Sequence, residues 1–271
     1  AFSSTWVRDI KQQGEYKNLV SDGRNHFTHE HKGAQLYKDT ETNPYVEAFF
    51  KWWETDLHKT LDELRITGGE PMMSPSLWRL LDWFEIQKHK VNPNMRLAIN
   101  SNLVPKRELF VKFMEKVKNV PNLHIYTSNE STYEQSNYIR DGMNYTTWYT
   151  HLVNLPGTVK PAGIHNMCTI NALCLESLPE FLDDVVKNKK AWKRVYDVDF
   201  NFTLNILRFP SFQSPLVLPD NLRTQFKNNL QKWLDKNIED LEPMEVAHTS
   251  RLIDYLDIVK TPHSEAFDLP K

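Results

Sequence analysis

The sequence is poor in cysteine and has no long apolar run and no excess of charge. Its 271 residues include two cysteines, too few for a disulfide framework, so we expect a reducing, cytoplasmic location. No apolar stretch approaches the roughly 20 residues that span a bilayer. The net charge of −2 gives no electrostatic attraction to nucleic acid or to an anionic membrane. We therefore expect neither nucleic acid nor a membrane as a partner.

Glycine is also scarce, which makes one adjacent pair informative. Gly68 and Gly69 follow a strand-like run at residues 61–67 and precede Glu70 and Pro71. Because glycine has no Cβ, such a pair lets the backbone turn sharply and come close to a ligand. Glu70 adds a carboxylate, and Pro71 fixes the exit from the turn. Ligands bind at the carboxyl ends of strands in α/β folds, so this tetrapeptide is a candidate binding segment.

Short strand-like runs alternate with amphipathic, helix-like stretches along most of the chain. Strands are expected at residues 61–67, Arg96–Asn100, 123–128, 162–170 and 199–207. Helices are expected at residues 46–64 (running into the first strand), 75–90, 106–117, 145–155, 175–187, 221–237 and 245–259. This alternation predicts an α/β fold with a parallel sheet, either a complete barrel or a partial one. Five strands are too few for eight-fold closure.

Four segments at or beyond the strand ends resemble motifs of the radical S-adenosylmethionine (radical SAM) enzymes. They are Thr67-Gly68-Gly69-Glu70-Pro71, Ile99-Asn100-Ser101-Asn102, Tyr126-Thr127-Ser128-Asn129-Glu130 and Tyr138-Ile139-Arg140-Asp141-Gly142. The resemblance implies a partial TIM barrel of the radical SAM kind, (βα)6 in type, over residues 1–210. It also implies the start of a C-terminal, α-rich extension over residues 211–271, as in the branch with twitch or SPASM extensions.

The function implied by the resemblance is specific. The family binds S-adenosylmethionine and, with a 4Fe–4S cluster and an external electron donor, cleaves it reductively to a 5′-deoxyadenosyl radical. This radical abstracts hydrogen from a substrate, which in this branch is often a peptide or protein. The cofactor-binding residues that the resemblance implies here are Gly68, Gly69, Glu70, Pro71, Ser101, Asn102, Ser128 and Arg140. The Gly-Gly-Glu-Pro backbone would meet the methionine amino group, and the Arg140 guanidinium would pair with the carboxylate. No catalytic residue or metal ligand is assigned.

The chain departs from the family at its defining feature, a C-x3-C-x2-C loop that holds the cluster. Its cysteines, Cys168 and Cys174, come about a hundred residues too late and have the wrong spacing. We expect them to be small buried residues of a strand and the following helix. The start, Ser3-Ser4-Thr5-Trp6, resembles the segment after the third cysteine in this branch. We therefore expect a fragment that lacks the first strand and the cluster loop and is inactive as given.

Two other functions remain open. One is a non-catalytic TIM-like domain that binds S-adenosylmethionine or a nucleotide without a cluster. The other is a TIM-type hydrolase in which Glu70 and Glu130 act as paired carboxylates. The histidines His26, His29 and His31 resemble a metal cluster, but no carboxylate or thiol completes it, and we expect a solvated loop there.

Overall fold

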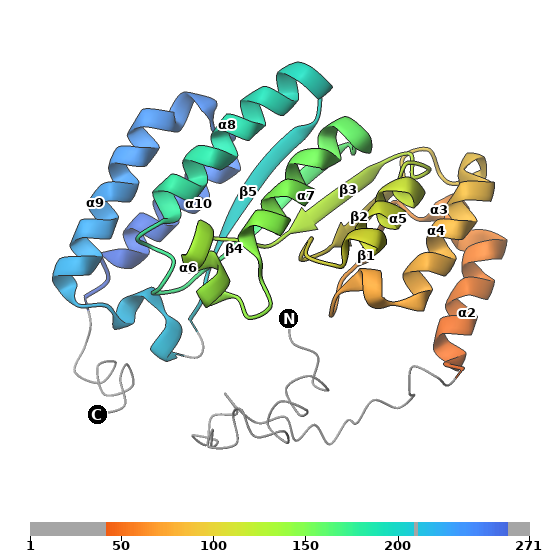
Figure 1. The fold of residues 1–271 in the computed structure, drawn as a ribbon, viewed down its shortest axis with the longest axis horizontal. Coiled ribbons are helices and arrows are strands. Elements are labelled where there is room, and N and C mark those ends of the chain that lie inside the picture. Colours follow the sequence, from red (N-terminus) through yellow and green to blue (C-terminus); the bar gives the residue numbers. More distant parts are fainter. Residues whose placement is uncertain (1–41, 209–210, 260–271) are drawn as a thin grey trace.

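One parallel sheet of five strands organises the computed structural model, which describes residues 42–208 and 211–259 (Figure 1). The strands are β1 (Glu63–Ile66), β2 (Arg96–Asn100), β3 (Leu123–Thr127), β4 (Gly163–Ile170) and β5 (Asp199–Ile206). They lie side by side in sequence order, and each neighbouring pair is parallel. The predicted α/β class, the parallel sheet and all five strands are confirmed.

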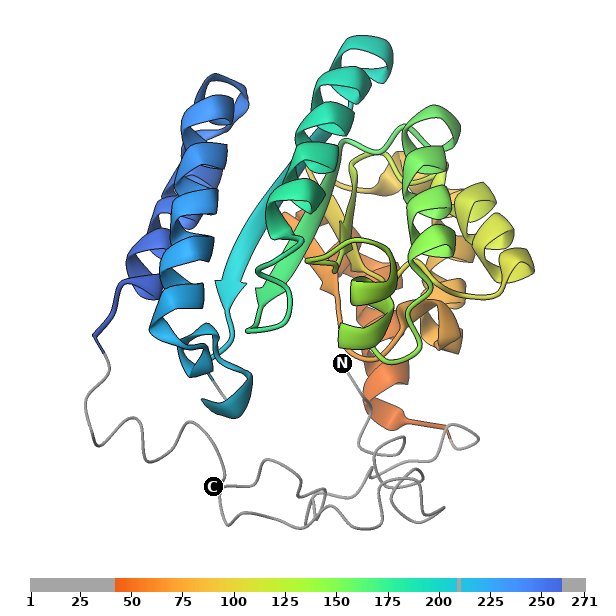
Figure 2. The same cartoon turned by 60° about the vertical axis from the view of Figure 1, so that its left-hand side comes forward.

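Helices connect the strands and continue beyond the last one. They are α2 (Pro44–Trp52), α3 (His58–Thr60), α4 (Pro75–Gln87), α5 (Arg107–Val117), α6 (Tyr133–Ile139), α7 (Tyr145–Thr158), α8 (Leu178–Tyr196), α9 (Asp220–Asn237) and α10 (Pro243–Leu256). A π-helical turn, Trp53–Leu57, joins α2 to α3. Short 3₁₀ turns lie at Pro71–Met73, Lys88–Lys90, Ser211–Gln213, Pro215–Val217 and Ile238–Asp240. Figures 1 and 2 show α4, α5, α7 and α8 along one face of the sheet.

The two faces of the sheet differ because side chains alternate along each strand. The face toward these helices is mainly apolar and is buried from β2 to β5, with Leu97, Ile125 and Phe200 all 0% exposed. Burying each such side chain stabilises the fold by roughly 1.5–3 kcal/mol. The opposite face, here called the polar face, is partly exposed. It carries Glu63, Arg65, Arg96, Asn100, His124, Tyr126, His165, Met167, Thr169, Asn201, Thr203 and Asn205.

Helix α10 covers the outer edge of β5 with side chains rather than with another strand. Glu245 accepts a hydrogen bond from the Phe202 backbone N–H at 3.0 Å. His248 Nδ1 accepts one from the Leu204 N–H at 2.9 Å, and Arg251 donates to the Leu204 carbonyl at 2.6 Å. An unpaired strand edge leaves backbone groups open to association, and these three side chains satisfy three of them. At the other edge, β1 pairs with β2 alone among the described strands.

Several local predictions needed correction. No helix was predicted directly after β3, yet α6 lies there, and α8 ends at Tyr196, well beyond the predicted residue 187. The helix expected at residues 46–64 runs from Pro44 to Thr60 and contains the π-helical turn, where wider π-type bonding replaces the regular i→i−4 pattern. Cys174 lies in a turn before α8, not in the helix. The histidines 26, 29 and 31 and residues 3–6 lie outside the described residues. Within the described ranges, no helix has the length and apolar character needed to cross a bilayer.

Candidate functional site

The loops after β1, β2 and β3 lie together at the carboxyl edge of the sheet. Parallel pairing in register places Ile66 beside Ile99 and Asn100 beside Tyr126, so the residues that follow these strands leave from one edge. The first three motif segments are therefore neighbours in space. The fourth, around Arg140, follows helix α6 and is joined to the third by an ion pair.

The Gly68-Gly69 turn leaves an open backbone. Gly68 has φ +125°, a conformation that a residue with a side chain rarely adopts. Nothing lies within 4 Å of the position that a Cβ would take at Gly68 or at Gly69, and both residues are exposed. The free space at this turn can admit a ligand close to the main chain.

Glu70 holds the first two loops together. Its Oε1 accepts hydrogen bonds from the Ser101 hydroxyl at 2.8 Å and from the Met72 N–H at 3.2 Å. Its Oε2 accepts one from the Asn102 N–H at 2.9 Å. The next residue, Pro71, is buried and starts the 3₁₀ turn. Both carboxylate oxygens are thus committed within the protein, so Glu70 acts here as a brace between strand ends.

The other predicted residues at this edge differ in whether their side chains have hydrogen-bonding groups left for a ligand. Ser101 is buried, and its hydroxyl also accepts from the Leu103 N–H. Asn102 is exposed, although its Oδ1 accepts from the Val104 N–H and its amide nitrogen is left to make other contacts. Ser128 is half-buried and makes no hydrogen bond to any residue in the described ranges. Asn102 and Ser128 are therefore the side chains most available to a ligand.

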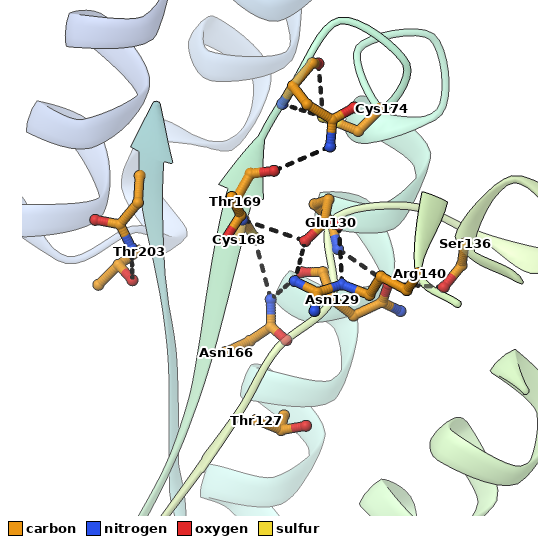
Figure 3. Close-up of polar contacts among 12 residues, drawn as sticks. Thr127, Asn129, Glu130, Ser136, Arg140, Asn166, Cys168, Thr169, Cys174 and Thr203 are labelled. Carbon is orange, nitrogen blue, oxygen red and sulfur yellow. Dashed lines mark hydrogen bonds and ion pairs between the residues drawn. The ribbon is translucent and has the colours of Figure 1, made fainter. Parts of the chain in front are cut away.

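Arg140 is paired with Glu130 (Figure 3). Its Nε donates to one Glu130 oxygen at 2.9 Å and its Nη2 to the other at 2.6 Å, the two-pronged geometry that suits a guanidinium and a carboxylate. The Thr169 N–H donates to the same carboxylate at 3.2 Å. Glu130 is 1% exposed, whereas the Arg140 side chain keeps 24% of its surface exposed. The guanidinium edge predicted to meet a cofactor carboxylate is occupied by a carboxylate of the protein.

Buried amides fix the loop that carries Glu130. Asn129 Oδ1 accepts from the Ser136 hydroxyl at 2.8 Å and from the Glu130 N–H at 3.0 Å. Asn166, on β4, donates to the Asn129 carbonyl at 2.7 Å. Asn129 Nδ2 and Asn166 Oδ1 have no hydrogen-bond partner among the described residues, although both side chains are 0% exposed. The ends of β3 and β4 are thus held as one unit, as Figure 3 shows.

The cysteines do not form a metal site. Cys168 and Cys174 are both 0% exposed, which confirms the predicted burial, and both are free thiols. Burial raises the pKa of each thiol well above its usual range, which opposes the thiolate form that binds iron. No group of three metal-binding side chains is present in the described ranges. With two cysteines in the whole sequence, this chain does not fit a 4Fe–4S cluster.

The polar face carries a histidine pair that the sequence analysis missed. His124 Nδ1 and His165 Nε2 are 2.9 Å apart, and Tyr126 stacks on His165 with ring centroids 4.5 Å apart. A Cβ on Gly163 would lie 2.9 Å from His124 Nδ1 and 3.0 Å from His165 Nε2, so glycine makes room for the pair. The alternation of polar and apolar residues in β3, β4 and β5 could have indicated a polar face of the sheet. Strand registers then decide which of them meet.

Both histidines are held neutral in the fold. Burial lowers the pKa of His124 to about 4, helped by the positive charge of Arg96. Burial likewise lowers the pKa of His165 to about 4, helped by His124 and Arg96. At neutral pH one nitrogen of the pair donates a hydrogen bond and the other accepts it.

This neutral pair predicts a loss of stability on acidification. Between pH 6.5 and about pH 4 the two histidines bind protons in the unfolded chain but remain neutral in the folded one. The free energy of unfolding therefore falls as the pH falls. We expect about 1–3 kcal/mol from the pair, after allowance for solvent screening. Urea unfolding across this range measures it. The variant with His124→Gln and His165→Gln should lose this part of the pH dependence; an unchanged slope would contradict the assignment.

Comparison with known protein families and with curated proteins finds no family model and no relative that matches this chain.

Proposed function

We propose that this chain is a partial barrel of the radical SAM type whose carboxyl-edge loops bind S-adenosylmethionine. One observation carries the proposal: the first three motif segments follow three adjacent parallel strands in the expected order, and the first of them presents an open glycine turn. Open main chain is what recognition of an ammonium group by carbonyl oxygens requires. The sequential strand order β1 to β5 is compatible with a barrel wall.

The proposed contacts follow from which groups are free. The Gly68-Gly69 backbone would meet the methionine amino group, and Asn102 and Ser128 would offer hydrogen bonds to polar groups of the ligand. Ser101, Glu70 and Pro71 would act by shaping the loops. Contact between Arg140 and the cofactor carboxylate would have to use Nη1 and the second Nη2 N–H, because Nε and one Nη2 N–H donate to Glu130.

The proposed activity is binding, without cleavage by this chain alone. The resemblance implies a 4Fe–4S cluster for reductive cleavage, and the two buried cysteines do not fit one. Radical formation, an external electron donor and a peptide or protein substrate are proposals for a protein in which three further thiolates are supplied. We place the protein in the cytoplasm, since neither cysteine is in a disulfide.

A non-catalytic binding domain is the second candidate function, and the contacts of the described residues favour it over the hydrolase. A domain that binds S-adenosylmethionine or a nucleotide needs the open turn and the polar strand ends, and it needs no thiolate. The hydrolase alternative is disfavoured by the contacts of its two carboxylates. Glu70 accepts three hydrogen bonds from its own loops, and Glu130 is buried against Arg140. Neither is left to act on water or on a glycosidic bond.

A steric block at Gly69 tests the binding proposal. A valine there enters open space and its Cβ meets no protein atom within 4 Å, so Gly69→Val should fold while filling the ligand's place. We expect calorimetry with S-adenosylmethionine to show at least about a tenfold rise in Kd, or about 1.4 kcal/mol. Ala162→Val, at an exposed position before β4, is the matched control and should bind normally. Equal binding by both variants, or none by the unaltered chain, would contradict the proposal.

A further inference from the structure

We propose that the polar face around Arg96, His124 and His165 is a second binding site, which takes the oxyanion group of a small molecule. The site is separate from the carboxyl-edge loops, because these residues lie on the strands themselves, toward the amino ends of β2 and β3. The proposal does not depend on the binding of S-adenosylmethionine.

Arg96 is the guanidinium of the polar face that lacks a direct ion pair with a described residue. Arg65 pairs with Glu63 at 2.7 Å, and Asp199, at the start of β5, pairs with Lys193 at 3.0 Å. Arg96 has no ion pair with any described residue, and its Nε has no hydrogen-bond partner there. Glu63 lies opposite Arg96 in the β1–β2 register, but its carboxylate is hydrogen-bonded to Arg65, and a partly buried guanidinium without a directly paired carboxylate is costly. Its planar set of N–H donors matches the oxygens of a carboxylate or phosphate.

Arg96 is also held in place by its neighbours. Its Nη2 donates a hydrogen bond to the Tyr126 hydroxyl. The Arg65 guanidinium lies over the Tyr126 ring, 4.8 Å from its centroid, and that of Arg96 lies 5.7 Å from it. Two cations therefore flank one aromatic ring on the face that no described helix of the α4 to α8 layer covers (Figures 1 and 2). Such fixed donors lose little conformational freedom when they bind.

The neighbouring histidines can add a hydrogen-bond donor to the site. The neutral pair shares one N–H internally and has one further N–H to offer a ligand, and Gly163 leaves the room that the two rings fill. The charged groups that act on His124 are Arg96 from β2, Glu63 from β1 and Asp199 from β5.

Anion binding should therefore couple to proton uptake. Arg96 lowers the pKa of both histidines, and an oxyanion on Arg96 would offset that charge. The bound anion would then stabilise a protonated imidazole, which in turn would donate to it. The expected signature is a rise in the pKa of the histidine pair when the anion is present.

Histidine-ring NMR on the full chain, from about pH 4 to about pH 8, tests this. The probes are inorganic phosphate and acetate, each compared with chloride at equal ionic strength, and His124→Gln and His165→Gln assign the signals. We expect phosphate or acetate to raise the apparent pKa of the pair by about one unit or more. A response to phosphate alone assigns a phosphate ester as the ligand class, and a response to acetate assigns a carboxylate.

Three arginine variants make the test decisive. Arg96→Gln should abolish the anion-dependent shift, and Arg96→Lys, which keeps the charge, should retain part of it. Arg79→Gln, which removes an exposed arginine from α4, should leave the shift unchanged. Identical titrations in chloride, phosphate and acetate would overturn the proposal, as would a full shift in Arg96→Gln.

Discussion

Arg140→Ala should destabilise the fold by about 3–5 kcal/mol, because it leaves the Glu130 carboxylate buried without its partner. Glu130 is 1% exposed and accepts two hydrogen bonds from the guanidinium. One bond, from the Thr169 N–H, would remain. Urea unfolding followed by circular dichroism gives the free energy of unfolding, and the midpoint should fall with little change in slope.

The reciprocal variants separate the buried charge from lost packing. Glu130→Gln should cost less than Arg140→Ala, since the partly exposed guanidinium it leaves behind can be hydrated. Adding Glu130→Gln to Arg140→Ala should recover part of the loss, because no unpaired charge is then buried. Arg140→Ala within about 0.5 kcal/mol of the unaltered chain would contradict the ion pair. The same double variant allows the proposed ligand contact of Arg140 to be measured without that loss.

The sheet was predictable from sequence because its strands are short segments that are either mostly apolar, as in β2, or alternate apolar with polar residues, as in β3 and β5. Strand β2 has the bounds predicted for it, Arg96–Asn100. Strands β3, β4 and β5 each differ from their own predicted bounds by one residue at one end. Three consecutive buried positions, as in β2, leave few alternatives to a central parallel strand. Helix α6 was missed because its sequence is polar and begins after Thr132, whose side chain makes no capping hydrogen bond to the helix.

The candidate site was only partly predictable, because its contacts join residues far apart in the chain. The glycine turn followed from local sequence and is open in the structure. The Glu70 brace joins residues 31 positions apart, and the histidine pair joins residues 41 positions apart. Strand alternation indicates that His124 and His165 are polar-face residues. Only the register of β3 against β4 shows that they meet. Arg140 was assigned to a ligand because no local pattern indicates that Glu130 would bind it.

The edge of β5 supplies the other large expected effect. Glu245 is 0% exposed and accepts from the Phe202 N–H at 3.0 Å, from Lys189 at 2.6 Å and from the Glu242 N–H at 2.8 Å. Glu245→Ala leaves two N–H groups without their acceptor and the Lys189 ammonium, 13% exposed, without its close partner. We expect a loss of about 3–5 kcal/mol in the free energy of unfolding.

Glu242→Ala is the matched control on the same helix, since Glu242 is half-exposed, 3.7 Å from Lys189, and caps the start of α10. It should cost about 0.5–2 kcal/mol, the range for a lost N-terminal cap. Hydrogen exchange then locates the effect: Glu245→Ala should speed exchange at Phe202 and Leu204, because α10 no longer covers the strand edge. Equal costs for the two variants, with both amides still protected, would mean that β5 is not held by these side chains. Faster exchange confined to the Glu245 variant would mean that a helix, and not a further strand, closes this side of the sheet.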